Sequence, residues 1–176
     1  DPLSPILAAG QGFPARFSGD TATALRIFQA VEKQWPDFPF IHYQLGLVYS
    51  AEGRWEDAIR HYRAALPVYG LNLVGGPLAY AYAKSGEREE ALRLRGQMLE
   101  LSRRGYFPPV TLAAAEVGLG DLDAALDQLE SALELHDDLG VLLPQPLAGA
   151  QVERHVRPAP VVDFRLEGDE GLRLAV

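Results

Sequence analysis

The side chains that could carry chemistry in this chain are few and lie far apart in the sequence. The four histidines are His42, His61, His136 and His155. The chain has no cysteine, which excludes disulfides, thiolate metal sites and cysteine nucleophiles. The run His136-Asp137-Asp138 could ligate a metal, but neighbouring residues on a helix point in different directions, so we interpret it as a solvated helix end. We expect no metal site and no cofactor.

Sequence signatures of enzymes are also missing. The chain has no G-x-S-x-G elbow, no phosphate-binding loop, no H-E-x-x-H zinc motif and no dinucleotide fingerprint. A net charge of −8 argues against nucleic acid as the partner, because phosphate binding needs a basic surface. No apolar run approaches the length of a membrane span. We therefore expect a protein without catalytic activity, and 176 residues are enough for one domain or one repeat array.

Small residues recur with a fixed period, and this period indicates the elements. Four positions of the first unit recur 34 residues later in the second unit with the same or a similar residue. The matching positions are Gly12 and Gly46, Gly19 and Gly53, Ala24 and Ala58, and Phe28 and Tyr62. Two of these positions recur in later units, as Gly86 and Ala91 and then as Gly120 and Ala125. A period of this length is typical of stacked helix–turn–helix units.

The second unit shows the helices most clearly. We predict that its first helix ends at Gly53 and that its second helix approaches closely at Gly46. In the first unit, the glycines and the proline of residues 10–14 predict a kinked or frayed first helix. In the third unit, Gly75-Gly76-Pro77 is expected to weaken the start of the first helix. In the fourth unit, Asp121 can cap the second helix.

The residues at these positions resemble the tetratricopeptide repeat. The second unit matches its pattern at Gly46, Tyr49, Gly53, Ala58, Tyr62 and Ala65. Arg95 replaces the usual aromatic residue in the third unit, and Glu116 replaces the usual tyrosine in the fourth. The resemblance implies an all-α, right-handed α-solenoid of antiparallel helix pairs over residues 4–136. Its repeats are expected at about 5–37, 38–70, 72–104 and 106–138.

The rest of the chain departs from the repeat pattern. We expect residues 139–157 to cap the array, and residues 158–176 to form a linker and a tail. Alternating residues on either side of a glycine-rich turn make the tail a candidate β-hairpin, and the alternative is a disordered tail. Because the chain begins at Asp1, we expect it to be a segment of a longer protein.

The resemblance also implies a concave groove lined by the first helix of each unit. The predicted lining residues are Phe13, Arg16, Phe17, Phe40, Tyr43, Leu47, Tyr80, Lys84 and Phe107. Aromatic side chains with few charges are typical of the centre of a protein interface, although these side chains could instead belong to the core. The few cations argue against the family's clamp for a chaperone carboxylate. His42 falls at a packing position of the repeat, and His61 lies beside Tyr62 on the second helix.

We therefore predict a non-catalytic protein–protein interaction module whose groove binds an apolar or aromatic peptide, or which associates with itself as a homo-oligomer. The alternative is a sensory or regulatory segment of a larger bacterial signalling protein or enzyme, because residues 105–135 also resemble arrays attached to bacterial regulators. A third hypothesis is a small-molecule pocket between Phe17, Tyr43 and Tyr80. The arginine-rich composition is typical of a GC-rich bacterial genome, and we expect a cytoplasmic location.

Overall fold

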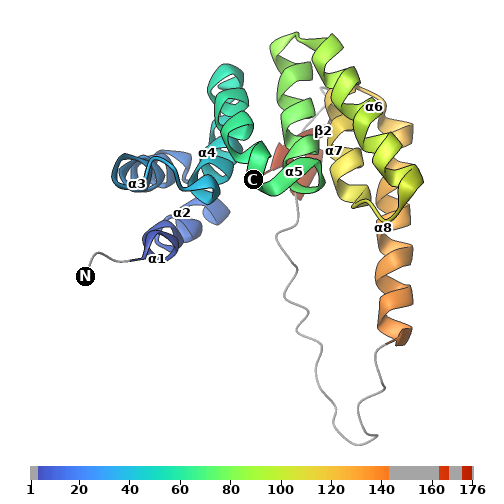
Figure 1. Ribbon diagram of the computed structural model, residues 1–176, viewed down its shortest axis with the longest axis horizontal. Coiled ribbons are helices and arrows are strands. Elements are labelled where there is room, and N and C mark those ends of the chain that lie inside the picture. The colour runs from blue at the N-terminus through green and yellow to red at the C-terminus, as the bar shows by residue number, and fades with distance from the viewer. Residues whose placement is uncertain (1–3, 143–162, 167–171, 176) are drawn as a thin grey trace, which may run out of the picture.

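The computed structural model describes residues 4–142, 163–166 and 172–175, with side chains as far as residue 133. The helices of this part follow one another along its long axis (Figure 1). They are α1 (Pro5–Gly10), α2 (Phe13–Ser18), α3 (Thr21–Gln34), α4 (Pro39–Ala51), α5 (Trp55–Ser85), α6 (Arg88–Arg104), α7 (Pro109–Leu119) and α8 (Leu122–Leu142).

Each helix packs against helices that are close to it in the sequence. In the first unit α1 and α2 contact α3, and α3 contacts α4 of the second unit. Farther along, α4 packs on α5, α5 on α6 and α7, and α7 on α8. Helix α5 is interrupted at Gly70, whose φ of 64° and ψ of −175° are not helical. The half before Gly70 belongs to the second unit, and the half after it belongs to the third. The predicted all-α solenoid of helix pairs is confirmed.

Glycines without room for a side chain set the closest helix contacts. A Cβ atom added to Gly46 would lie 2.5 Å from the ring of Tyr62, so α4 and α5 can meet only if residue 46 is glycine. Gly12 has the same relation to the ring of Phe28 in the first unit. The predicted helix end at Gly53 is confirmed by its φ of 69°, since this left-handed conformation favours glycine.

The two irregular stretches behave differently from each other. In the first unit, the predicted irregularity divides the first helix into two short helices, because α1 ends at Gly10 and α2 begins at Phe13. In the third unit the expected weakening at residues 75–77 is wrong, because these residues lie within α5 and are buried. Gly76 packs directly against the backbone of Thr111 of α7, and Gly75 packs against Met98 of α6. These glycines therefore allow α5 to approach its neighbours and do not disturb the helix.

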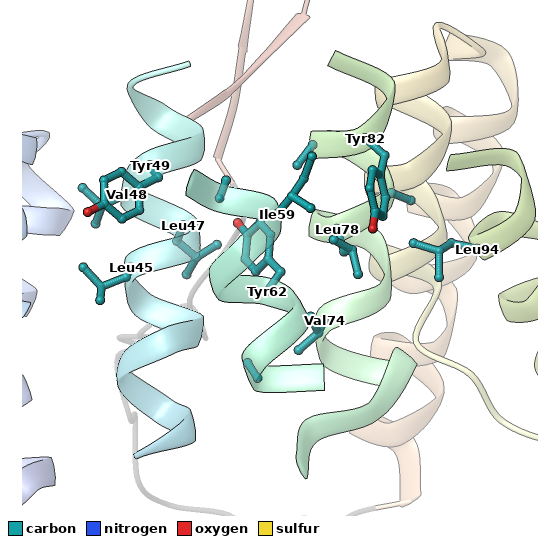
Figure 2. Close-up of a cluster of buried hydrophobic side chains, with 14 of the residues drawn as sticks. Leu45, Leu47, Val48, Tyr49, Ile59, Tyr62, Val74, Leu78, Tyr82 and Leu94 are labelled. Carbon is teal, nitrogen blue, oxygen red and sulfur yellow. The ribbon is translucent and has the colours of Figure 1, made fainter. Parts of the chain in front are cut away.

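The core runs along the array between the paired helices. Side chains from α4, both halves of α5 and α6 meet in one cluster, in which Tyr62 lies between α4 and the second half of α5 (Figure 2). Tyr62 is fully buried, and its hydroxyl lies 3.1 Å from Ser50 Oγ. In the fourth unit, Asp121 precedes the second helix, α8, and its carboxylate accepts a hydrogen bond from Ala124 N at 3.2 Å, so the predicted cap is confirmed.

The tail contains a pair of strands. Strand β1 (Asp163–Leu166) pairs antiparallel with β2 (Leu172–Ala175), with Asp163 opposite Ala175 and Leu166 opposite Leu172. These strands coincide with the two alternating segments of the sequence, and the glycine-rich turn between them lies outside the described residues. Helix α8 continues to Leu142, past the end predicted for the fourth repeat. The predicted capping segment beyond residue 142 and the linker 158–162 lie outside the described residues.

Candidate functional site

The nine residues predicted to line a groove fall into two groups. Phe17 is 59% exposed and Lys84 is exposed, while Phe13, Phe40 and Tyr43 are half-buried. The remaining members are buried, and they are Arg16, Leu47, Tyr80 and Phe107. Leu47 and Phe107 belong to the main hydrophobic core, so they hold helices together and are not open to a partner. The accessible members therefore lie mostly in the first two units.

The accessible aromatic residues lie on α2, α4 and the first half of α5 in two groups of neighbouring rings. We call them together the aromatic strip, which consists of Phe17, Phe13, Phe40, Tyr43 and Tyr69. Phe13 of α2 lies 6.3 Å from the ring of Phe17 and 5.9 Å from that of Phe40 of α4. Tyr43 of α4 lies 6.3 Å from the ring of Tyr69 at the end of the first half of α5. The strip thus continues from the first unit into the second, and Phe17 is its most exposed described member.

Arg16 places a cation beside the strip. Its guanidinium carbon lies 4.2 Å from the centroid of the Phe17 ring, a cation–π arrangement. Burial lowers the pKa of Arg16, while the nearby hydroxyls of Tyr43 and Tyr62 oppose this change. The Nε atom of Arg16 is buried without a hydrogen-bond partner. An arginine in this position can still donate a hydrogen bond to an acceptor group of a bound partner, because a guanidinium group has five N–H donors.

Tyr80 and Lys84 lie in a different environment from the strip. Tyr80 packs edge to face on Trp55 at 5.9 Å, in a small cluster with Val117 and Ala125. Lys84 Nζ lies 5.4 Å from the centroid of the Tyr80 ring. Tyr80 is only 4% exposed, so it is not a wall of the small-molecule pocket that the sequence suggested. An open hollow of about 480 Å³ lies elsewhere, between Leu71 of α5 and the outer side of α6.

Three helices bring together a second group of polar side chains, which we call the histidine cluster. It consists of Glu32 of α3, His42 of α4 and His61 of α5. His42 Nδ1 lies 3.2 Å from His61 Nδ1. Glu32 Oε1 lies 3.5 Å from the Nδ1 of His42 and 3.6 Å from the Nδ1 of His61. The three atoms therefore form a small, nearly equilateral triangle.

The surroundings of the cluster fix its protonation. Burial and then the positive charge of Arg60 lower the pKa of His61 to about 4, so His61 is neutral near pH 7. Its ring stacks on that of Tyr49, with centroids 5.2 Å apart. His42 Nε2 lies 2.7 Å from the carbonyl oxygen of Pro36. A carbonyl only accepts, so Nε2 of His42 carries a proton, and in this neutral tautomer the lone pair is on Nδ1, which faces the cluster.

Sequence reasoning missed the histidine cluster. It treated His42 and His61 separately, as packing residues, and Glu32 was not considered. The cluster could have been found only from the packing of the repeats. In a stacked array the first helix of one unit lies between its own second helix and the second helix of the preceding unit. The contacts of α4 with α3 and α5 are of this kind. That arrangement places a histidine of α4 beside residues of both neighbours.

The comparisons with known families agree with the repeat geometry. Three models described as Tetratricopeptide repeat match residues 39–66, 78–105 and 110–131. A search of the curated proteins found none that matches this chain. Among the described helices, none has the length and apolar composition needed to cross a membrane.

Proposed function

This chain belongs to the tetratricopeptide repeat family, with several repeats, and we propose that it binds a protein partner through the aromatic strip of its first two units. Tetratricopeptide repeats are in general non-catalytic modules for protein–protein interaction. The observation that carries the proposal is the exposure of Phe17, whose ring is 59% exposed although it lies next to other aromatic rings. Exposed aromatic side chains beside half-buried ones are typical of interface anchors.

The chemistry of the strip favours an apolar or aromatic segment as its ligand. Its members offer ring faces and two tyrosine hydroxyls, and these groups bind apolar side chains and accept or donate a few hydrogen bonds. Arg16 supplies one buried cation, which suits a single backbone carbonyl or carboxylate of the partner. A ligand that relied on its terminal carboxylate alone would need several cations, and Lys84 lies on the far half of α5, beside Tyr80.

The test is a selection of peptides from a random library displayed on phage, followed by affinity measurements with synthetic peptides. We expect the selected peptides to be rich in apolar and aromatic residues. Phe17→Ala should weaken their binding at least tenfold, because an exposed anchor contributes to binding without supporting the fold. The matched control is Tyr106→Ala, which removes an aromatic side chain that is 76% exposed at the turn before α7.

Two results would contradict the proposal. One is equal binding by the wild-type chain and Phe17→Ala, and the other is equal loss in Phe17→Ala and Tyr106→Ala. Circular dichroism and melting curves of all three proteins would show that the fold is unchanged. The hypothesis of a regulatory segment within a larger signalling protein remains a prediction, and it is compatible with either outcome because such a segment can also act through a bound partner.

A further inference from the structure

The histidine cluster has the ligand types and the size of a metal site. Its two imidazole nitrogens and one carboxylate oxygen come from three different helices and lie 3.2, 3.5 and 3.6 Å apart. In a tetrahedral zinc site the ligands lie about 2.0–2.2 Å from the ion, so two ligand atoms are separated by about 3.3–3.6 Å. The 3.5 and 3.6 Å distances fall within this range, and the 3.2 Å distance lies just below it. A single ion could therefore contact all three atoms after small side-chain movements.

The hydrogen bonds around the cluster support ligation. His42 donates its Nε2 proton to the carbonyl oxygen of Pro36, and metal-binding histidines commonly orient themselves by such a bond. In the absence of an ion, His61 Nδ1 is the donor to the lone pair of His42 Nδ1. When an ion binds to His61 Nδ1, it occupies the position of the Nδ1 proton. The imidazole of His61 remains neutral and carries its proton on Nε2 instead.

We propose that Glu32, His42 and His61 bind a zinc-type divalent ion through Glu32 Oε1 and the Nδ1 atoms of both histidines. Two imidazoles and one carboxylate suit zinc and exclude magnesium as the preferred ion, because magnesium selects oxygen ligands. The three protein ligands leave a fourth position for water. The Glu32 and His42 side chains are 31% and 16% exposed, so water reaches the site from their side.

Charged side chains of both signs lie around the cluster. Glu32 supplies one negative charge to the ion, and Arg60 places a positive charge beside the cluster, with its Nη2 3.5 Å from His61 Nε2. Arg60 is exposed and forms an ion pair of 2.6 Å with Asp57, but Arg54 shares this carboxylate, so the charge of Arg60 is offset only in part. Because Arg60 is 65% exposed, it can turn away when His61 Nε2 carries a proton. The charge in direct contact with the ion is then the negative one of Glu32.

The ion would join two repeat units. Glu32 lies in the last part of α3, the second helix of the first unit, whereas His42 and His61 belong to the two helices of the second unit. A bound ion links the three helices directly, so binding should stabilise the junction between the units. Stabilisation by a ligand that binds only the folded state rises with its concentration relative to its dissociation constant.

The first experiment is calorimetric titration of the chelator-treated chain with Zn²⁺, using Mg²⁺ as a second probe. We expect one Zn²⁺ per chain, a higher melting temperature with Zn²⁺, and no response to Mg²⁺. Glu32→Gln replaces the charged carboxylate with a neutral amide, a weaker zinc ligand, and His42→Phe removes the ligating nitrogen, while both keep the shape of the side chain. Each variant should weaken Zn²⁺ binding at least tenfold. These two variants keep the test valid even if a change at the buried His61 prevents folding.

Matched controls separate this site from other zinc-binding groups. Glu56→Gln removes an exposed carboxylate of α5, and His136→Ala removes a histidine outside the cluster, so both should bind Zn²⁺ as the wild-type chain does. Co²⁺ provides a geometric readout, because a tetrahedral site gives strong visible absorption that Glu32→Gln should reduce. The proposal is overturned if the wild-type chain binds no Zn²⁺, or if Glu32→Gln and His42→Phe bind it as tightly as the controls.

Discussion

Arg95 and Glu116 occupy two positions at which the repeat pattern usually has aromatic side chains. Arg95 Nε donates to Glu116 Oε1 at 2.6 Å, so the two departures from the pattern compensate each other across α6 and α7. The side chain of Glu116 is only 3% exposed, and its Oε2 has no partner among the described residues. A buried carboxylate of this kind is stable only while its partner remains.

Removal of one member of this pair should lower the free energy of unfolding much more than replacement of both members. Arg95→Ala leaves the Glu116 carboxylate buried and unpaired, so we expect the free energy of unfolding to fall by about 2–4 kcal/mol. The double variant Arg95→Phe/Glu116→Tyr restores the usual residue types and should recover most of the loss. Urea denaturation of the three proteins measures both effects. A double variant no more stable than Arg95→Ala would contradict this explanation.

Tyr62 should make the protein less stable in alkali. Its complete burial raises its pKa, and the hydrogen bond with Ser50 opposes this only in part. Above the unfolded value near pH 10, the unfolded chain releases the Tyr62 proton while the folded chain retains it, so the free energy of unfolding decreases as the pH rises. Below about pH 10 this contribution is fully present.

Tyr62→Phe tests this linkage. The variant removes the titrating hydroxyl, so its free energy of unfolding should decrease less steeply between about pH 9 and pH 11 than that of the wild-type chain. At neutral pH it should be less stable by about 1 kcal/mol, because Ser50 loses its partner. Equal slopes in alkali would show that Tyr62 ionises in the folded protein.

At the scale of the elements, a single glycine divides α5 between two repeats. Gly70 combines a φ of 64° with a ψ of −175°, a conformation essentially restricted to glycine. We expect Gly70→Ala to lower the free energy of unfolding by about 1–3 kcal/mol, as measured by urea denaturation. The control is Gly96→Ala in α6, where a Cβ atom meets nothing within 4 Å. There alanine should stabilise the helix by about 0.5–1 kcal/mol. Similar changes at both positions would contradict the assigned role of Gly70.

The sequence predicted most of the elements, for a reason that also explains its failures. Gly46 and Gly53 were assigned correctly because a close contact and a left-handed turn each admit little except glycine. The same local reasoning placed a weakness at residues 75–77 and overlooked Gly70, because a glycine at a contact and a glycine at a turn look alike in the sequence. Buried Tyr80 was assigned to a groove since the repeat register gives the direction of a side chain but not what covers it. The histidine cluster needed contacts between units, which no local pattern contains.

At the scale of the whole molecule, an array whose helices contact only near neighbours can open one unit at a time. The first unit is the best candidate for early opening. Its α1 and α2 are six residues each, and α1 exposes Ile6 and Leu7 instead of packing them. Arg16 adds a buried nitrogen without a partner, which weakens the packing of α2.

Hydrogen exchange measured by mass spectrometry should therefore show lower protection in α1–α3 than in α4–α7, because amides of a unit that opens locally exchange without global unfolding. If the histidine cluster binds Zn²⁺, the ion should raise protection in α3 much more than in α6, since Glu32 would be tied to α4 and α5. In Glu32→Gln this gain should disappear while the difference between the units without metal remains. Uniform protection from α1 to α7 would mean instead that the described array opens as one cooperative unit, and that its first junction is as strong as the others.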